Sequence, residues 1–313
     1  MAAATAGVSG PVAPPPFAEA ARVFAGIGLL SFGGPAAQIA LMHRVLVGER
    51  QWLDEATYLR ALNFCMLLPG PEAMQLATFA GWRLHGLKGG LTAGLLFMLP
   101  GAVVVLALAM LYSNYGTLPL VAAVFLGVKA AVLVIVVEAL LRVARKALKE
   151  SAHWVIAGLA FAALFCFDAP FPLVVIAAAI AGAICLRQTA SAATAPLPPV
   201  PWRGTIFTIA AWLAIWWAPV ALAAAWLGGD HVLVSIGVFF SKLAVVTFGG
   251  AYAVLTYMAQ QAVESYRWLT PGEMLDGLGL AETTPGPLIL VTEFVAYLGA
   301  SRAGGSWSIG ILG

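Results

Sequence analysis

The chain has 313 residues, of which 62% are hydrophobic and only 10% are charged, with a mean hydropathy of +0.94 and a formal net charge of +2. Soluble domains carry about 25% charged residues, so this composition excludes a soluble globular protein and predicts a chain surrounded by lipid. The basic residues are scattered or lie at the ends of apolar runs, which argues against a nucleic-acid partner.

Sequence motifs for catalysis, metals and nucleotides are absent. The three cysteines lie far apart without a C-x-x-C pair, and the four histidines show no ligand spacing, so we expect buried thiols, no metal and no cofactor. The chain has no H-E-x-x-H, no G-x-S-x-G and no glycine-rich stretch ending in G-K-[ST]. It is therefore predicted not to be an enzyme and not to bind ATP through a Walker motif.

In chain order, residues 1–16 are rich in Ala, Gly and Pro and lack the positive start of a signal peptide, so we expect a disordered tail. Beyond it we expect a transporter half at 17–186, a Pro- and Ala-rich linker at 187–203 and a second half at 204–313. Four apolar runs are about long enough to cross roughly 30 Å of hydrocarbon: 91–112, 118–141, 205–227 and 231–248. Two shorter runs, 154–167 and 172–186, are expected to form a helical hairpin.

One segment of the chain occurs twice. Residues 31–97 align without a gap on residues 247–313, which lie 216 positions later, with 17 identities in 67 aligned positions. The identities gather at Gly, Pro and Trp, and an internal repeat in an apolar chain is typical of transporters built from two related halves. Since residues 98–186 continue the first half and the second copy ends at Gly313, we expect the second half to be truncated.

The distribution of positive charge favours opposite orientations for the two copies. The first copy holds five Lys or Arg residues and the second holds two, as expected if the second copy is inserted upside down. The predicted fold is therefore an all-α polytopic membrane protein with two inverted-topology repeats. Short re-entrant or broken helices are expected at the F-G-G and P-G-P motifs.

Between these motifs, the first copy is too polar for a simple span. Residues 36–55 include charged side chains that cannot face lipid cheaply, so an amphipathic interfacial segment is expected there. Two short helices, 56–68 and 72–84, are predicted to follow and to meet at Pro69-Gly-Pro71. Neither is long enough to span comfortably, and a re-entrant hairpin fits best.

The repeated turns are the leading candidates for a binding site. Proline suits the first turn of a helix, glycine allows a tight turn and close approach, and free N–H groups at a helix start bind anions. The alternative is that P-G-P only turns a hairpin and that F-G-G only packs helices. The predicted binding residues from these motifs are Gly33, Gly34, Pro69, Gly70, Pro71, Gln75, Gly249, Gly250, Pro285, Gly286 and Pro287.

Charged residues inside apolar runs add to this candidate site. Lys129 and Lys242 are predicted to help bind an anion, while Arg22 either does so or reaches the near interface. Three carboxylates near the turns, Glu72, Glu282 and Glu293, are candidates to carry a coupling proton. For Glu72 the alternative is a helix-capping role.

Taken together, these motifs resemble the chromate ion transporter family. The resemblance lies in G-L-L-S-F-G-G-P-A-A-Q (28–38), L-P-G-P-E-A-M-Q-L-A (68–77), G-W-R-L-H-G-L-K-G-G (81–90), T-F-G-G-A-Y-A-V (247–254) and T-T-P-G-P (283–287). It covers nearly the whole chain after residue 17. It implies a bacterial inner-membrane protein with two related, oppositely oriented halves that exports chromate, with sulfate as a related oxyanion.

The sequence thus predicts a multi-pass secondary transporter that exports chromate from between the two P-G-P turns. Two alternatives stay open: transport of sulfate or another oxyanion, and a membrane subunit that transports nothing. The expected partners are the oxyanion and the lipid bilayer, without nucleic acid. The oligomeric state stays open, with a homodimer as one alternative.

Overall fold

A computed structural model describes residues 14–116, 118–148, 151–167, 169, 171–185, 202–247, 251–305 and 307–313. Helices dominate these residues, and none of them forms a strand. This confirms the predicted all-α class. The chain divides into two compact units, one made of Met1–Val132 with Ser235–Gly313 and the other of Leu133–Val234. Both repeat copies belong to the first unit, and the predicted halves at 17–186 and 204–313 stay a prediction.

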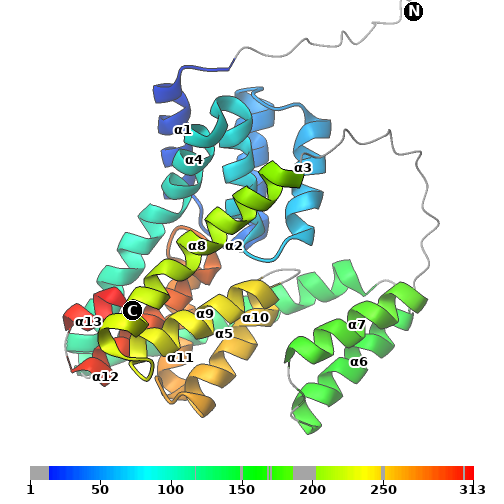
Figure 1. Ribbon diagram of the computed structural model, residues 1–313. Helices are drawn as coiled ribbons and strands as arrows, with labels where there is room; N and C mark the ends of the chain where they lie inside the picture. Colours follow the sequence, from blue (N-terminus) through cyan, green and yellow to red (C-terminus); the bar gives the residue numbers. More distant parts are fainter. Residues whose placement is uncertain are drawn as a thin grey trace, which may run out of the picture. The chain divides into compact units, whose positions relative to one another are not determined.

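The first copy and its flanking helices surround the start of one long helix. α1 (Phe17–Leu29), α2 (Gly34–His43) and α3 (Glu55–Leu67) all contact α4 (Glu72–Tyr115), as Figure 1 shows. A π-helical turn, η1 (Arg44–Glu49), connects α2 to α3. The side chains buried between these elements include Phe24, Met42, Leu46, Tyr58, Leu76 and Phe97.

α4 is two helices joined at a kink. His85 and Gly86 leave the helical conformation, and Gly86 has a φ of +58°. The two parts then pack on each other so closely that a Cβ on Gly81 would overlap the carbonyl oxygen of Gly89, and the reverse also holds. The part before the kink corresponds to the predicted short helix 72–84, and the part after it contains the predicted span 91–112. The kink therefore confirms that these are separate helices.

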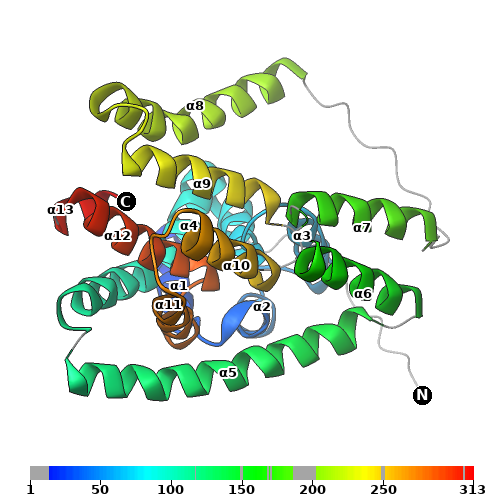
Figure 2. The same cartoon turned by 90° about the horizontal axis from the view of Figure 1, so that it is seen from below.

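The second copy forms the other side of the first unit. It comprises α10 (Ala251–Gln260), η2 (Gln261–Ser265), α11 (Pro271–Thr283), η3 (Leu288–Leu290), α12 (Val291–Gly304) and α13 (Trp307–Leu312). α12 is almost entirely buried from Phe294 to Ala300. It contacts α4, α11 and α13, and Figure 2 shows α11 and α12 beside α4.

The remaining helices are apolar and carry many exposed hydrophobic side chains. α5 (Pro119–Ala147) and α9 (Val232–Val246) belong partly to each unit, and α6 (Ser151–Cys166), α7 (Phe171–Cys185) and α8 (Trp202–Leu227) lie in the second. α6 and α7 contact each other, which confirms the predicted hairpin. By length and composition, α4 and α8 could each cross a membrane, and shorter apolar helices lie at Ser151–Cys166, Leu173–Gly182 and Val232–Val246.

The two copies share backbone details that go beyond the shared residues. Gln51 and Arg267, which occupy equivalent positions, have φ values of +52° and +53°, unusual for residues other than glycine. The next residue in each copy is a tryptophan whose backbone N–H donates to an equivalent carbonyl at 2.8 Å: Trp52 to Leu46 in the first copy and Trp268 to Ala262 in the second. The repeat is thus a repeat of conformation, including the π-helical turns η1 and η2.

The short helices after these turns begin with equivalent caps. The side chain of Asp54 accepts the N–H of Thr57 at the start of α3, and the Thr57 bonds hold the pKa of that exposed carboxyl below its usual value. At the equivalent position, Thr270 begins α11 with a capping box formed with Glu273. Both caps fix where the chain turns back towards a P-G-P motif.

A matched pair of glycines on α1 tests the close packing in the first copy. A Cβ on Gly28 would overlap the main chain at Leu96, whereas a Cβ on Gly26 would meet no atom within 4 Å. We expect Gly28→Ala to cost about 1–3 kcal/mol through overpacking, and Gly26→Ala to be neutral or to gain up to about 1 kcal/mol in helix propensity. Thermal unfolding of the two variants in detergent measures the difference. Equal unfolding temperatures would show that α1 does not pack on α4 this closely.

Candidate functional site

Each P-G-P motif forms a sharp turn between two helices. α3 ends at Leu67 and α4 begins at Glu72, while α11 ends at Thr283 and η3 begins at Leu288. The central glycines, Gly70 and Gly286, have φ values of +113° and +94°, a region that side chains disfavour. The prolines Pro71 and Pro287 stand immediately before the next helix, which is close to the predicted role as helix starts.

Each turn is bound to the opposite copy by one main-chain hydrogen bond. The N–H of Gly70 donates to the carbonyl of Thr247 at 2.8 Å, and the N–H of Gly286 donates to the carbonyl of Ser31 at 2.9 Å. Ser31 and Thr247 are equivalent residues of the repeat, and so are Gly70 and Gly286. An exchange in which each copy contacts the other through the same pair of positions is the property of an approximate two-fold relation.

Ser31 and Thr247 can accept these bonds because each one ends a helix. Their hydroxyl groups donate back to the carbonyls of Ile27 and Leu243 at 2.6 Å. Both residues lie just past helix ends, at Leu29 and Val246, where carbonyls lack a partner in their own helix. In the first copy, Gly33 with a φ of +82° separates α1 from α2. The predicted helix break at the first F-G-G is confirmed.

The bonds from the two turns to the opposite copies determine which backbone N–H groups can bind an anion. The N–H groups of Gly70 and Gly286 are occupied by carbonyls in this conformation, so the turn glycines themselves do not offer them. The first N–H groups of α4, beginning at Glu72, cannot be bonded within their own helix. The positive end of the α4 dipole is therefore the part of the first turn that suits an anion.

Gln38 strengthens the contact between the first helix break and the second turn. Its side chain is 1% exposed, and its Nε2 donates to the carbonyl of Gly286 at 2.6 Å and to that of Ser31 at 3.2 Å. The equivalent residue of the second copy is Val254, which cannot form these bonds. At the first turn, Gln75 instead donates to the carbonyl of Pro69 at 2.7 Å, and its own equivalent is Val291.

The second turn is the more deeply buried of the two. Gly286 and Pro287 are buried, whereas Pro69 is exposed and Gly70 and Pro71 are partly exposed. Gly101 of α4 covers the second turn so closely that a Cβ there would overlap the carbonyl of Pro285. The predicted turn residues thus come together with the first F-G-G break, but the two turns do not have equal surroundings.

The other predicted residues differ in how well they fit the candidate site. Lys242 is exposed on α9, and Arg22 is exposed on α1. Lys129 lies in α5, but its side chain, together with Gly249 and Gly250, lies outside the described residues. Among the carboxylates, Glu72 and Glu282 are partly buried, and Glu293 has one buried oxygen, Oε2, without a hydrogen-bond partner among the described residues.

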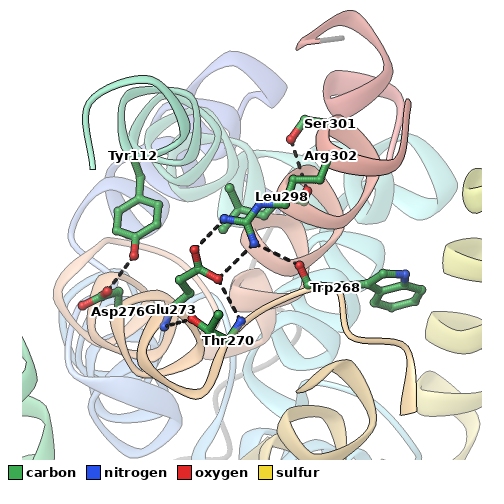
Figure 3. A network of polar contacts seen from close by, with 8 residues as sticks. All are labelled: Tyr112, Trp268, Thr270, Glu273, Asp276, Leu298, Ser301 and Arg302. Atoms are coloured by element: carbon green, nitrogen blue, oxygen red, sulfur yellow. Dashed lines mark hydrogen bonds and ion pairs between the residues drawn. The ribbon is translucent and has the colours of Figure 1, made fainter. Parts of the chain in front are cut away.

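A second polar cluster joins α4, α11 and α12, and sequence patterns did not reveal it. Tyr112 donates to the buried carboxylate of Asp276 at 2.7 Å, and Arg302 binds both oxygens of Glu273, as Figure 3 shows. Arg302 also donates to the main-chain carbonyl of Trp268 at 3.1 Å. Asp276 could have been suspected because it is an acidic residue in the otherwise apolar, glycine-rich run 274–281.

Comparison with known proteins identifies the family. The profile of the chromate transporter family matches residues 18–183 and 234–313. The chain belongs to the chromate transporter family. Membership makes it a membrane protein, and the relatives named below are transport proteins rather than enzymes.

The chain is similar to curated family members from three bacteria. It is 36% identical to a chromate transport protein of Pseudomonas aeruginosa over 93% of this chain and 69% of the relative. It is 31% identical to a probable chromate transport protein of Synechococcus elongatus over 90% and 69%, and 31% identical to a chromate transport protein of Cupriavidus metallidurans over 90% and 67%. No solved structure matches the chain significantly.

Replacing Gln38 tests whether its bonds hold the second turn in place. We expect Gln38→Leu to lower stability by about 1–3 kcal/mol, because each of its two buried hydrogen bonds is worth about 1 kcal/mol and two carbonyls lose a donor. Thermal unfolding in detergent measures this, with Gln260→Leu as the matched control at an exposed position on α10. An unfolding temperature that drops no further for Gln38→Leu than for Gln260→Leu would contradict the assigned role.

Proposed function

We propose that this chain transports chromate across the inner membrane, as a secondary transporter that exports the anion from the cytoplasm. Support comes from family membership together with the reciprocal bonds between the P-G-P turns and the opposite helix breaks. Those bonds are the single observation that carries the proposal, because they bring the broken helices of both copies together. In transporters built from related halves, substrates bind where such broken helices meet.

The proposal places the approximate two-fold axis in the membrane plane, so that the copies are inverted. The exchange of equivalent bonds supports a two-fold relation, and the five-to-two imbalance of basic residues between the copies supports opposite orientation. Alternating access then requires one copy to move against the other about the paired turns. The chain accordingly passes the membrane several times.

Chromate and sulfate are tetrahedral dianions, so their site needs hydrogen-bond donors and positive charge. The start of α4 supplies N–H groups and the positive end of a helix dipole. Lys129 and Lys242 are proposed to supply charge, and glycine at the breaks leaves room for close approach. The proposed site comprises the turn and break residues together with these lysines: Gly33, Gly34, Pro69, Gly70, Pro71, Gln75, Lys129, Lys242, Gly249, Gly250, Pro285, Gly286 and Pro287.

Transport by the full chain in proteoliposomes tests this function. We expect labelled chromate to accumulate in the vesicles when a proton gradient is imposed and to be displaced by excess sulfate, a second tetrahedral dianion. Lys129→Gln is expected to weaken chromate binding, since a charge-assisted contact contributes about 1.5–3 kcal/mol, or roughly 10- to 150-fold in affinity. Lys88→Gln, at an exposed position on α4, is the matched control.

Alanine variants at two glycines with positive φ distinguish a specific loss of transport from a general effect of backbone strain. Gly286 in the second turn and Gly228, between α8 and α9, have φ values of +94° and +91°. Both alanine variants carry a similar φ penalty, and a Cβ on Gly286 would in addition lie 2.9 Å from the Leu290 side chain, whereas one on Gly228 would meet no atom within 4 Å. We expect Gly286→Ala to abolish transport and Gly228→Ala to retain it. Wild-type vesicles that accumulate neither chromate nor sulfate would refute the proposed function. Wild-type chromate affinity in Lys129→Gln would remove Lys129 from the site.

A further inference from the structure

A buried carboxylate at the centre of the second polar cluster has no role in the anion site described above. Asp276 is 3% exposed and lies on α11, the helix that runs into the second P-G-P turn. Its Oδ2 accepts the hydroxyl of Tyr112 at 2.7 Å. Tyr112 lies on α4, the helix that begins at the first turn, so this single bond connects the two helices that carry the turns (Figure 3).

Aromatic packing holds the tyrosine in position. The Tyr112 ring makes edge contacts with Phe125 and Phe294, at centroid distances of 4.8 and 5.3 Å. The Phe294 ring fills the space beside Gly277, where a Cβ would lie 2.5 Å from it. The residue next to Asp276 is therefore glycine because α12 packs at that point. This packing leaves the Tyr112 hydroxyl aimed at the carboxylate.

Among the described residues, the helices that pack against α11 bring few titratable groups towards Asp276, and the basic one, Arg302, is bound to Glu273. α11 packs against α4, α12 and η3. α4 presents Tyr112, and η3 has no titratable side chain. α12 carries two titratable residues, Glu293 and Arg302, and Arg302 is bound to both carboxylate oxygens of Glu273. Asp276 shares its own helix with Glu273 and Glu282. The one positive charge of the cluster thus has a dedicated acidic partner one helical turn from Asp276.

We propose that Asp276 takes up and releases the proton that drives oxyanion movement, with Tyr112 as its positioning residue. An ionised carboxylate away from water is unfavourable, and a proton on either oxygen removes the charge. The ionised carboxylate accepts the Tyr112 hydroxyl. A proton on Oδ1 leaves Oδ2 able to accept the Tyr112 hydroxyl only through a weaker, uncharged bond, whereas a proton on Oδ2 makes that oxygen a donor and reverses or breaks the bond. Binding one proton therefore changes the contact between α4 and α11.

This inference rests on the proposed transport function and names the site of its coupling. Glu293 is the rival among the carboxylates predicted from sequence, since one of its oxygens is buried. Asp276 fits better for two reasons. It is almost fully buried while Glu293 is only partly so, and it has a hydroxyl placed to respond to its charge. The equivalent of Asp276 in the first copy is Arg60, so the site occurs once in the repeat.

The test uses the full chain in proteoliposomes, with chromate uptake measured with and without an imposed proton gradient. Asp276→Asn keeps the shape of the side chain but cannot take up a proton. We expect it to lose the stimulation by the gradient while chromate binding, measured by titration calorimetry, stays at the wild-type level. Glu264→Gln, at an exposed position on η2, is the matched control, and both it and Glu293→Gln should keep the stimulation.

A second variant keeps the proposal testable if Asp276→Asn does not fold. Tyr112→Phe retains the carboxylate and the aromatic packing but removes the hydroxyl that favours the ionised form. Its pH profile of transport should shift to higher pH. Wild-type stimulation in Asp276→Asn, its loss in Glu293→Gln alone, or an unchanged pH profile in Tyr112→Phe would overturn the assignment. Wild-type transport without any gradient stimulation would overturn it too, while leaving the anion transport function intact.

Discussion

The structure depends on two backbone hydrogen bonds in which each copy of the repeat donates to the other. Gly70 and Gly286 each place an N–H on the carbonyl that ends a helix in the opposite copy. Within lipid, an unpaired main-chain group costs several kcal/mol, so a broken helix is tolerated only where a partner completes its bonding. Neither break is complete alone. Each copy supplies the groups that the other lacks, so these two bonds join the copies within the first unit.

The same constraint explains where small residues are placed. The turn at Pro285 lies against α4 at Gly101, and α1 approaches α4 at Gly28. A side chain at either position would hold the backbones apart, and short main-chain bonds need that close approach. In apolar surroundings, helix association relies on such packing rather than on a hydrophobic driving force. Gly28 and Gly101 flank the repeated segment, whereas the shared turn glycines, Gly70 and Gly286, keep the same positive-φ geometry in both copies.

Sequence predicted the elements better than the contacts between them. The repeat, the short helices ending at P-G-P and the hairpin of α6 and α7 follow from turn residues and run lengths, which are local properties. That the turn amides are used by the opposite copy was not predictable, because backbone pairing between residues 177 and 255 positions apart leaves no side-chain signature. Asp276 escaped for a related reason. A single acidic residue in an apolar run shows its importance only once the distant Tyr112 is found beside it.

Differences between the copies argue that their roles are unequal. Where the first copy has Gln38 and Gln75 bracing the turns, the second has valines, and where the second has Asp276, the first has Arg60. A symmetric scaffold can give two equivalent states of access, since exchanging the conformations of the copies converts one state into the other. Coupling to a driving ion needs asymmetry instead, because the ion must bind with different affinity in the two states of access. The shared residues thus suit the movement, and the unshared polar residues suit its control.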